Sequence, residues 1–222
     1  MNKKLSKWLR WLEVIKNEVQ DLVMTKRTFH EVQKFIKDNP QLHQPSSFYD
    51  YLSRTYVSHV VIGIRRQLKC GDQSISMAGL LEEMIATPEV LTRTYYVGLY
   101  KGSVVEQFAN KDFDKFAIQG APHIDPALVS ADLEKLRFAS KRCEDFADKR
   151  LAHRDKREPK ELPTYDEVDA CIDVLDNLYV RYLLLFHASN MTSLLPEMQY
   201  DWKAVFRVPW ISLTKTARRS EK

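Results

Sequence analysis

The sequence has few of the residues that interrupt regular structure. Its 222 residues include only 6 Gly and 9 Pro, which favours long regular elements over many turns. The three cysteines, Cys70, Cys143 and Cys171, are far apart and odd in number, and no pair has the spacing of metal ligands. We therefore expect free thiols in a reducing cytosol, with Cys143 and Cys171 buried on apolar helical faces, rather than a disulfide or a metal site.

Signals for export, membrane insertion and cofactor binding are absent as well. Charges at Lys7, Arg10 and Glu13 interrupt any apolar run near the N-terminus, so no signal peptide is expected. The longest apolar runs, at 57–64 and 183–186, are far shorter than the roughly 20 residues that span a bilayer. No Gly-rich phosphate loop and no His/Cys/Asp/Glu cluster occurs, so we expect a cytoplasmic protein without a metal, a cofactor or a membrane contact.

Composition and charge describe an ordinary globular chain. Hydrophobic residues make up 44% and charged residues 29%, which is too apolar for a disordered protein. A net charge of +4 is too small to indicate general nucleic-acid binding, although the stretches 2–10, 149–160 and 215–222 are locally basic. We predict a single domain over 1–222, with a core bundle over about 3–190 and an aromatic C-terminal extension at 196–222.

Hydrophobic periodicity predicts helices in the first half of the chain. Apolar residues at helical spacing run from 5 to 36, as one long helix or as two collinear helices if Thr28 and Glu31 form an internal capping box. Ser46 is a potential cap for a second helix that ends near Cys70, and its wide apolar face predicts the most buried helix of the protein. A short helix is expected over 76–85.

The second half of the chain gives similar signals. Thr87 and Pro88 suit the start of another helix. The pattern over 92–120 is mixed, but helix is favoured over strand because nothing offers a strand partner. Long helices are expected after Asp125-Pro126 and after Thr164, which forms a capping box with Glu167. These two helices should lie side by side, so the fold class is an all-α antiparallel helical bundle.

The stretch 139–157 contains the residues with the strongest potential for chemistry. At helical spacing, one stripe contains Leu136, Ala139, Cys143, Phe146, Arg150 and His153. An apolar stripe that ends in Arg150 and His153 should direct both into a cleft. There His153 can remove the proton of a ribose 2′-hydroxyl while Arg150 holds the phosphate, with Lys149, Arg154 and Arg157 nearby. Alternatively, these residues are the solvated basic end of a helix.

Three segments give the chain a resemblance to a known family. A-D-K-R-L-A-H-R-D at 147–155 resembles the signature of HEPN-domain proteins, in particular the abortive-infection AbiU-type branch, where the motif commonly runs Arg-Asn/Asp-Lys-x-x-Ala-His-x-Asp. I-R-R-Q-L-K-C-G-D-Q-S-I-S-M-A-G-L-L-E-E-M at 64–84 and D-W-K-A-V-F-R-V-P-W at 201–210 are similar to other parts of that branch. The resemblance implies an all-α bundle, often a homodimer with a shared cleft, and a ribonuclease of a toxin–antitoxin or phage-defence system.

The family motif can be placed on this chain residue by residue. The resemblance implies His153 as the base, while the polar position falls on Asp148 and the Lys and Ala positions fall on Lys149 and Ala152. The family's Arg falls on Ala147, which departs from the pattern. The departure puts catalysis in doubt but leaves the expected fold unchanged.

Other arginines are candidates to replace the missing one. Arg150 shares the stripe with His153, at a shorter spacing than the family's, and Arg142 lies more than two helical turns before His153. Arg65 and Arg66 can reach across a cleft from the second helix. The expected alternative is a structural ion pair with an acid such as Asp72 or Glu82.

Two kinds of function follow from the sequence. The chain is expected either to bind RNA, and to cleave it without a metal at an atypical site, or to be a non-catalytic helical module for dimerisation or partner binding. RNA, a second copy of the chain and a cognate antitoxin or defence partner are the expected partners. Four further histidines are isolated in the sequence and are expected to be structural or surface residues: His30, His43, His123 and His187.

Overall fold

The computed structural model describes residues 2–71, 73–151, 156 and 161–209. Its α-helices are α1 (Lys3–Asp38), α2 (Ser47–Leu68), α3 (Met77–Ala86), α4 (Arg93–Leu99), α5 (Ala109–Phe113), α6 (Pro126–Phe146) and α7 (Tyr165–His187). Short 3-10 segments are η1 (Pro40–Leu42), η2 (Pro88–Val90), η3 (Glu106–Phe108) and η5 (Trp202–Arg207), and η4 (Ala147–Leu151) is π-helical. The described residues contain no strand beyond an isolated bridge between Thr92 and His123, so the all-α prediction is confirmed.

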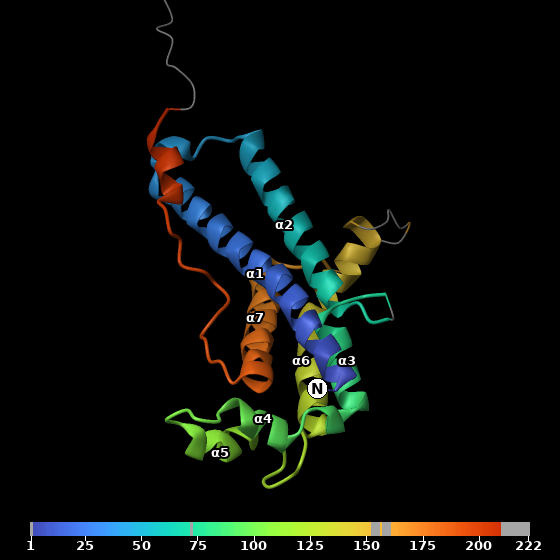
Figure 1. Cartoon of the computed structure of the whole chain (residues 1–222). Helices are drawn as coiled ribbons and strands as arrows, with labels where there is room; N and C mark the ends of the chain where they lie inside the picture. Colours follow the sequence, from blue (N-terminus) through green and yellow to red (C-terminus); the bar gives the residue numbers. More distant parts are fainter. Residues whose placement is uncertain (1, 72, 152–155, 157–160, 210–222) are drawn as a thin grey trace, which may run out of the picture.

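The long helices pack around one hydrophobic core. α1 crosses α7 and lies against α2, while α6 contacts α3, α7 and α2 (Figure 1). α4 and α5 lie together near the N-terminal end of α1, away from the end where α1 meets the C-terminal segment (Figure 1). This arrangement places the end of α6 beside α2, which matters for the site described below.

α1 is a single continuous helix, without the break that a capping box at Thr28 and Glu31 would have introduced. Its buried side chains step by three and four residues: Leu5, Trp8, Leu12, Ile15, Val19 and Leu22. Glu31 does not begin a new helix, because it lies inside α1 and its carboxylate binds Arg27 and Lys203. The helix ends where Asn39 caps it and Pro40 begins a 3-10 turn, as predicted.

The prediction that the second helix is the most buried is wrong. The half of α2 from Tyr56 to Gln67 packs into the core, but Phe48 and Tyr51 are 52% and 63% exposed. α7 buries more side chains than α2. In Figure 1, α2 and α1 diverge toward the first turns of α2, which also lie far from α3, so the apolar face of these turns has less to pack against. The helix also ends at Leu68, before Cys70.

The segment between α3 and α6 is helical, and the sequence had favoured helix over strand for it. Thr87 and Pro88 begin only the 3-10 turn η2, and α4 starts after Thr92, whose hydroxyl accepts a hydrogen bond from the Tyr95 amide. The expected start at Thr87-Pro88 is therefore wrong for an α-helix. Arg93 then holds the segment together by donating to the Ala121 carbonyl at 2.8 Å and to Asp114 at 2.6 Å.

α6 and α7 lie side by side, as predicted. Asp125 caps α6 by accepting from the Ala127 amide, and Pro126 is its first residue. Thr164 and Glu167 form the predicted capping box, with hydrogen bonds of 2.9 and 3.2 Å between the two residues. Both helix starts are thus encoded by local sequence.

The C-terminal segment packs on α1. Lys203 Nζ lies 2.7 Å from Glu31 Oε2, and the Phe35 ring lies 6.2 Å from the Trp202 ring and 5.4 Å from the Phe206 ring. Figure 1 shows this segment returning along the molecule to the far end of α1. The described part of the aromatic extension is therefore integrated into the fold.

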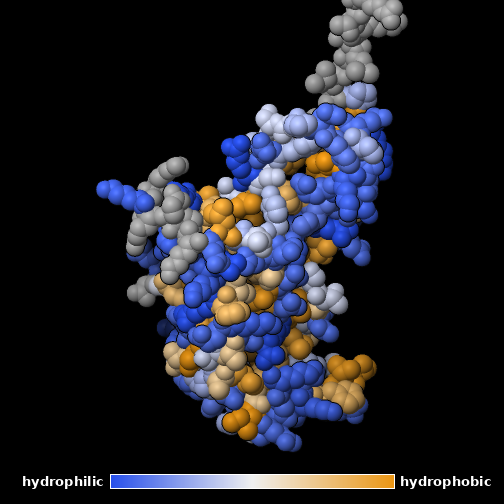
Figure 2. Space-filling model, turned by 180° about the vertical axis from the view of Figure 1, so that it is seen from behind, coloured by the Kyte–Doolittle hydropathy of each residue, from blue (hydrophilic) through white to orange (hydrophobic). Residues whose placement is uncertain are grey.

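The surface is mixed, with one apolar region that can be located in the fold. Figure 2 shows apolar side chains exposed at the end of the molecule formed by α4 and α5, where Leu99, Val104, Val105 and Phe108 are exposed. None of the helices in the described part of the chain is both long enough and apolar enough to cross a bilayer.

Replacing Leu12 by Ala tests the packing of α1 on the core. Leu12 is 0% exposed, so its truncation should lower the free energy of unfolding by about 3 kcal/mol through lost burial and a residual cavity. Val14 on the same helix is 43% exposed, and Val14→Ala should change that free energy by less than about 0.5 kcal/mol. Urea denaturation followed by circular dichroism measures both, and equal losses would contradict this orientation of α1.

Candidate functional site

The end of α6 departs from regular α-helical geometry. After Phe146 the chain continues as the π-helical turn η4, which covers Ala147–Leu151. π-helical turns are rare, occur within or at the ends of α-helices and are frequent at functional sites. This one includes Asp148, Lys149 and Arg150, three of the residues singled out from the sequence.

The buried face of α6 is displaced by one residue from the predicted stripe. Cys143 and Ala147 are both 0% exposed, whereas Phe146 and Arg150 are only half-buried. The buried residues Leu136, Ser140, Cys143 and Ala147 step by four, three and four, as in a regular α-helix, so the displacement is already present at Ser140, before the π-helical turn. The core face therefore passes through Ala147 rather than through Phe146.

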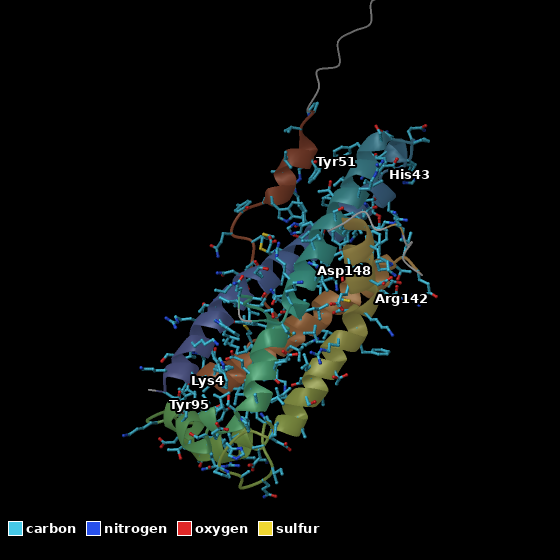
Figure 3. The ribbon with its side chains drawn as sticks, turned by 90° about the vertical axis from the view of Figure 1, so that its right-hand side faces the viewer. Lys4, His43, Tyr51, Tyr95, Arg142 and Asp148 are labelled. Atoms are coloured by element: carbon cyan, nitrogen blue, oxygen red, sulfur yellow. The ribbon has the colours of Figure 1, made fainter. Side chains whose placement is uncertain are left out.

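Two predicted site residues from distant parts of the sequence meet at this turn. Arg65 Nε on α2 donates to Asp148 Oδ1 at 2.5 Å. In Figure 3, Asp148 lies where the end of α6 meets α2, and Arg142 lies on a different side of α6. An ion pair for Arg65 was an expected alternative, but its acidic partner is Asp148 rather than Glu82, which instead binds Arg137. Asp72 lies outside the described residues.

The neighbouring cations are held in other ion pairs. Arg66 Nε donates to Glu18 on α1 at 2.9 Å, so Arg66 is turned away from Asp148 and toward another helix. Lys149 pairs with Asp145 at 2.6 Å, four residues earlier and on the same side of the helix. The side chain of Lys149 is only 18% exposed, so this pair is partly shielded from water.

Arg142 links α6 to the segment that begins α7. Its guanidinium binds Glu161 and lies 2.5 Å from Glu167 Oε1, the acid of the capping box. The backbone hydrogen bond from Thr164 and the charge of Arg142 hold the pKa of Glu167 below its usual value. Arg142 therefore serves packing between helices, and the structure does not bring it to Asp148.

A cavity of about 580 Å³ opens beside the end of α6. It is lined by Lys141, Arg142, Glu144, Asp145, Asp148 and Glu161. Acidic groups outnumber basic ones in this lining, so the described wall does not by itself attract a phosphate. His153, Arg154 and Arg157, the other residues expected at the site, lie outside the described residues.

The position of the family's arginine is a core position in this chain. Ala147 is 0% exposed, and α6 packs there against α2 and α7. An arginine at this point would have to bury its guanidinium or displace the helix. The departure from the motif is thus matched by the local packing, and any catalytic cation must come from elsewhere.

Sequence reasoning missed a cluster between α1, α2 and α7. His30 Nε2 lies 2.6 Å from Asp169 Oδ2, and the Tyr56 hydroxyl donates to Asp169 Oδ1 at 2.6 Å. Burial and this hydrogen bond raise the pKa of Tyr56. His30 is therefore a structural residue at the surface, as expected, although its partners were not foreseen. Its partners are 26 to 139 positions away in the chain, so no local spacing could reveal the cluster.

The other histidines behave as expected. His43 and His123 each bind backbone carbonyls, and His187 is exposed at the end of α7. Within the described ranges, no group of three or more His, Cys, Asp or Glu residues is arranged to hold a metal ion. Among the described residues, the chemistry available at the end of α6 is that of arginine, lysine and carboxylate side chains.

Comparison with known proteins gives one match. A family model described as AbiU2 matches residues 5–205, nearly the whole chain. The matched range contains α1 through α7, the π-helical turn and most of η5. No significant match to a curated protein or to a solved structure was found.

The lowered pKa of Glu167 predicts a stability that depends on pH. A carboxyl group whose pKa is lower in the folded state stabilises that state above its unfolded pKa, and the contribution disappears as pH falls through the folded pKa. The Glu167→Gln variant keeps a side chain that can complete the capping box but removes the charge beside Arg142. It should therefore unfold at lower urea concentration than wild type at pH 7, with the difference shrinking below about pH 4.

Glu134→Gln is the matched control for this experiment. Glu134 lies on the same helix as Arg142, its side chain is 71% exposed and it sits 3.6 Å from Arg137. The variant should unfold near the wild-type midpoint at both pH values. A Glu167→Gln deficit that persists undiminished at pH 3 would rule out the proposed role of the charge.

Proposed function

The chain belongs to the AbiU2 family of HEPN-type proteins, and we propose that it binds RNA in a defence or toxin–antitoxin system and cleaves it without a metal ion at an atypical site. The family match supports the defence-type role. The observation that carries the location of the site is the contact of Arg65 with Asp148 on the π-helical turn, at the position of the family motif. This contact gives the motif a cation that its own sequence lacks.

Arg65 is suited to contact a phosphate while it remains paired. Its hydrogen bond to Asp148 uses Nε, and the two terminal nitrogens of the guanidinium carry four further N–H donors. Arginine presents its donors in a planar fork that matches two phosphate oxygens. The side chain is 24% exposed, so it is held in place yet accessible. In this role Asp148 positions Arg65.

The cleavage step requires a base and stabilisation of negative charge. In the proposed site His153 takes the proton of the ribose 2′-hydroxyl, and the resulting oxygen attacks the adjacent phosphorus. Arg65, together with Arg150, would bind the phosphate oxygens on which negative charge develops. Lys149, Arg154 and Arg157 would contact neighbouring phosphates along the strand, which makes binding sensitive to salt.

A second function is supported by different observations. The burial of Ala147 and the acidic wall of the cavity both favour a non-catalytic module for dimerisation or partner binding. In that case the Arg65–Asp148 and Arg142–Glu167 contacts only join helices. The expected partner would then be a second copy of the chain, a cognate antitoxin or another defence protein.

Substitution of His153 separates these two functions. We expect wild-type protein to cleave RNA in the presence of EDTA and to slow bacterial growth when expressed, and His153→Ala to cleave at least about 100-fold more slowly. Gel analysis of tRNA and mRNA after incubation with each protein measures the rate. If wild-type protein leaves both RNAs intact at high concentration, the non-catalytic function is the correct one.

Arg65 and Arg66 form a matched pair for testing RNA contact. They are adjacent arginines on α2, and each binds one carboxylate of a different helix, Asp148 or Glu18. Arg65→Ala should weaken RNA binding by about 10-fold, whereas Arg66→Ala should weaken it much less. Fluorescence anisotropy with labelled single-stranded RNA at two salt concentrations measures both. Equal losses would show that Arg65 contributes only general positive charge.

A further inference from the structure

Two cysteine side chains meet between α6 and α7. Cys143 Sγ and Cys171 Sγ lie 3.7 Å apart, although the residues are 28 positions apart in the chain. Both residues are 0% exposed. The sequence alone favoured separate thiols, because nothing in the spacing of the cysteines indicates that two of them meet. Their proximity follows from the side-by-side packing of α6 and α7.

We propose that Cys143 and Cys171 are a redox-sensitive pair that forms a disulfide when the protein meets a peroxide. A disulfide bond is about 2.05 Å long, so the sulfurs need to approach by about 1.7 Å. Rotations of the two side chains with small shifts of the helices can supply that movement. The pair therefore needs no rearrangement of the fold to become linked.

The two thiols are not equivalent. The hydrogen bond from Cys143 lowers the pKa of Cys171, while that same bond and burial raise the pKa of Cys143. Once released from its 2.9 Å hydrogen bond to the Ala139 carbonyl, Cys171 is therefore the thiol that ionises first and the more nucleophilic partner toward an oxidant. Cys143 keeps its proton and lies in position to attack the oxidised sulfur.

The oxidation is balanced with a peroxide as the two-electron acceptor. The Cys171 thiolate attacks one oxygen of hydrogen peroxide, the O–O bond breaks, and the released hydroxide becomes water. This step leaves a sulfenic acid at Cys171. The Cys143 sulfur then attacks that sulfur, the S–O bond breaks, and a second water leaves with the proton of Cys143. The protein loses two hydrogen atoms, that is, two protons and two electrons.

The disulfide would close the loop that carries the family motif. Cys143 lies one turn before the π-helical turn, and Cys171 lies within α7, so residues 144–170 would be enclosed, His153 among them. Oxidation would fix both ends of this loop covalently. An effect of this covalent link on RNA cleavage rests on the proposed function, whereas the formation of the disulfide does not.

The experiment uses the full chain with Cys70→Ser, which removes the exposed third cysteine. The protein is treated with hydrogen peroxide, unfolded in denaturant, alkylated and weighed by mass spectrometry. We expect a loss of about 2 Da, no alkylation of Cys143 or Cys171, and a single peptide pair that joins the two residues. The oxidised protein should also unfold at a temperature several degrees higher, and a reductant should reverse both changes.

A matched variant and a contrary result make this test decisive. Cys171→Ser in the same background should add oxygen or an alkyl group at Cys143 and lose no mass. The proposal fails if the oxidised parent still carries two alkylatable thiols, or if it gains oxygen on both sulfurs without linking them. No RNA is present in this measurement, so its outcome is independent of the nuclease test.

Discussion

The packing of α6 against α7 is the constraint on which the rest of the site depends. The apolar face of α6 reaches Ala147 before the helix ends, and the capping box at Thr164 sets where α7 begins. Burial of each large side chain along such an interface contributes about 1.5–3 kcal/mol, far more than an exposed ion pair. The polar contacts at the end of α6 therefore adapt to a geometry that the core imposes. Asp148 meets Arg65, and Cys143 meets Cys171, because this packing brings the three helices together.

Local signals in the sequence predicted the helix starts, but not the contacts between helices. Thr164 with Glu167, and Asp125 with Pro126, act within one turn of the chain, so their role could be read from spacing. The exposure of Phe48 depends on how far α2 extends past its neighbours, which no local pattern contains. The same holds for the Asp148 partner of Arg65, which lies 83 positions away. The π-helical turn is a further case, because it changes the register that a regular period assumes.

The buried Ala147 explains how the chain can belong to the family and still lack its arginine. Ala147 continues the regular stripe of buried residues on α6, four residues after Cys143. Position 147 therefore faces the core, and Asp148 faces α2, where it pairs with Arg65. A cation is thereby recruited from α2 to a point near the one where the motif would place it. The presence of Ala147 in place of the family's arginine is therefore consistent with the burial of this position.

Charge balance at the end of α6 determines which function the site can perform. Three of the described cations there are already matched by carboxylates: Arg65 by Asp148, Lys149 by Asp145, and Arg142 by Glu161 and Glu167. A phosphate must compete with these acids unless further positive charge lies close by. The run 149–160 contains six Lys and Arg residues against two acids, and it follows directly from this turn. RNA recognition at this site thus requires the excess positive charge of this run to lie on the same surface as Arg65. A structural module requires only the ion pairs named above.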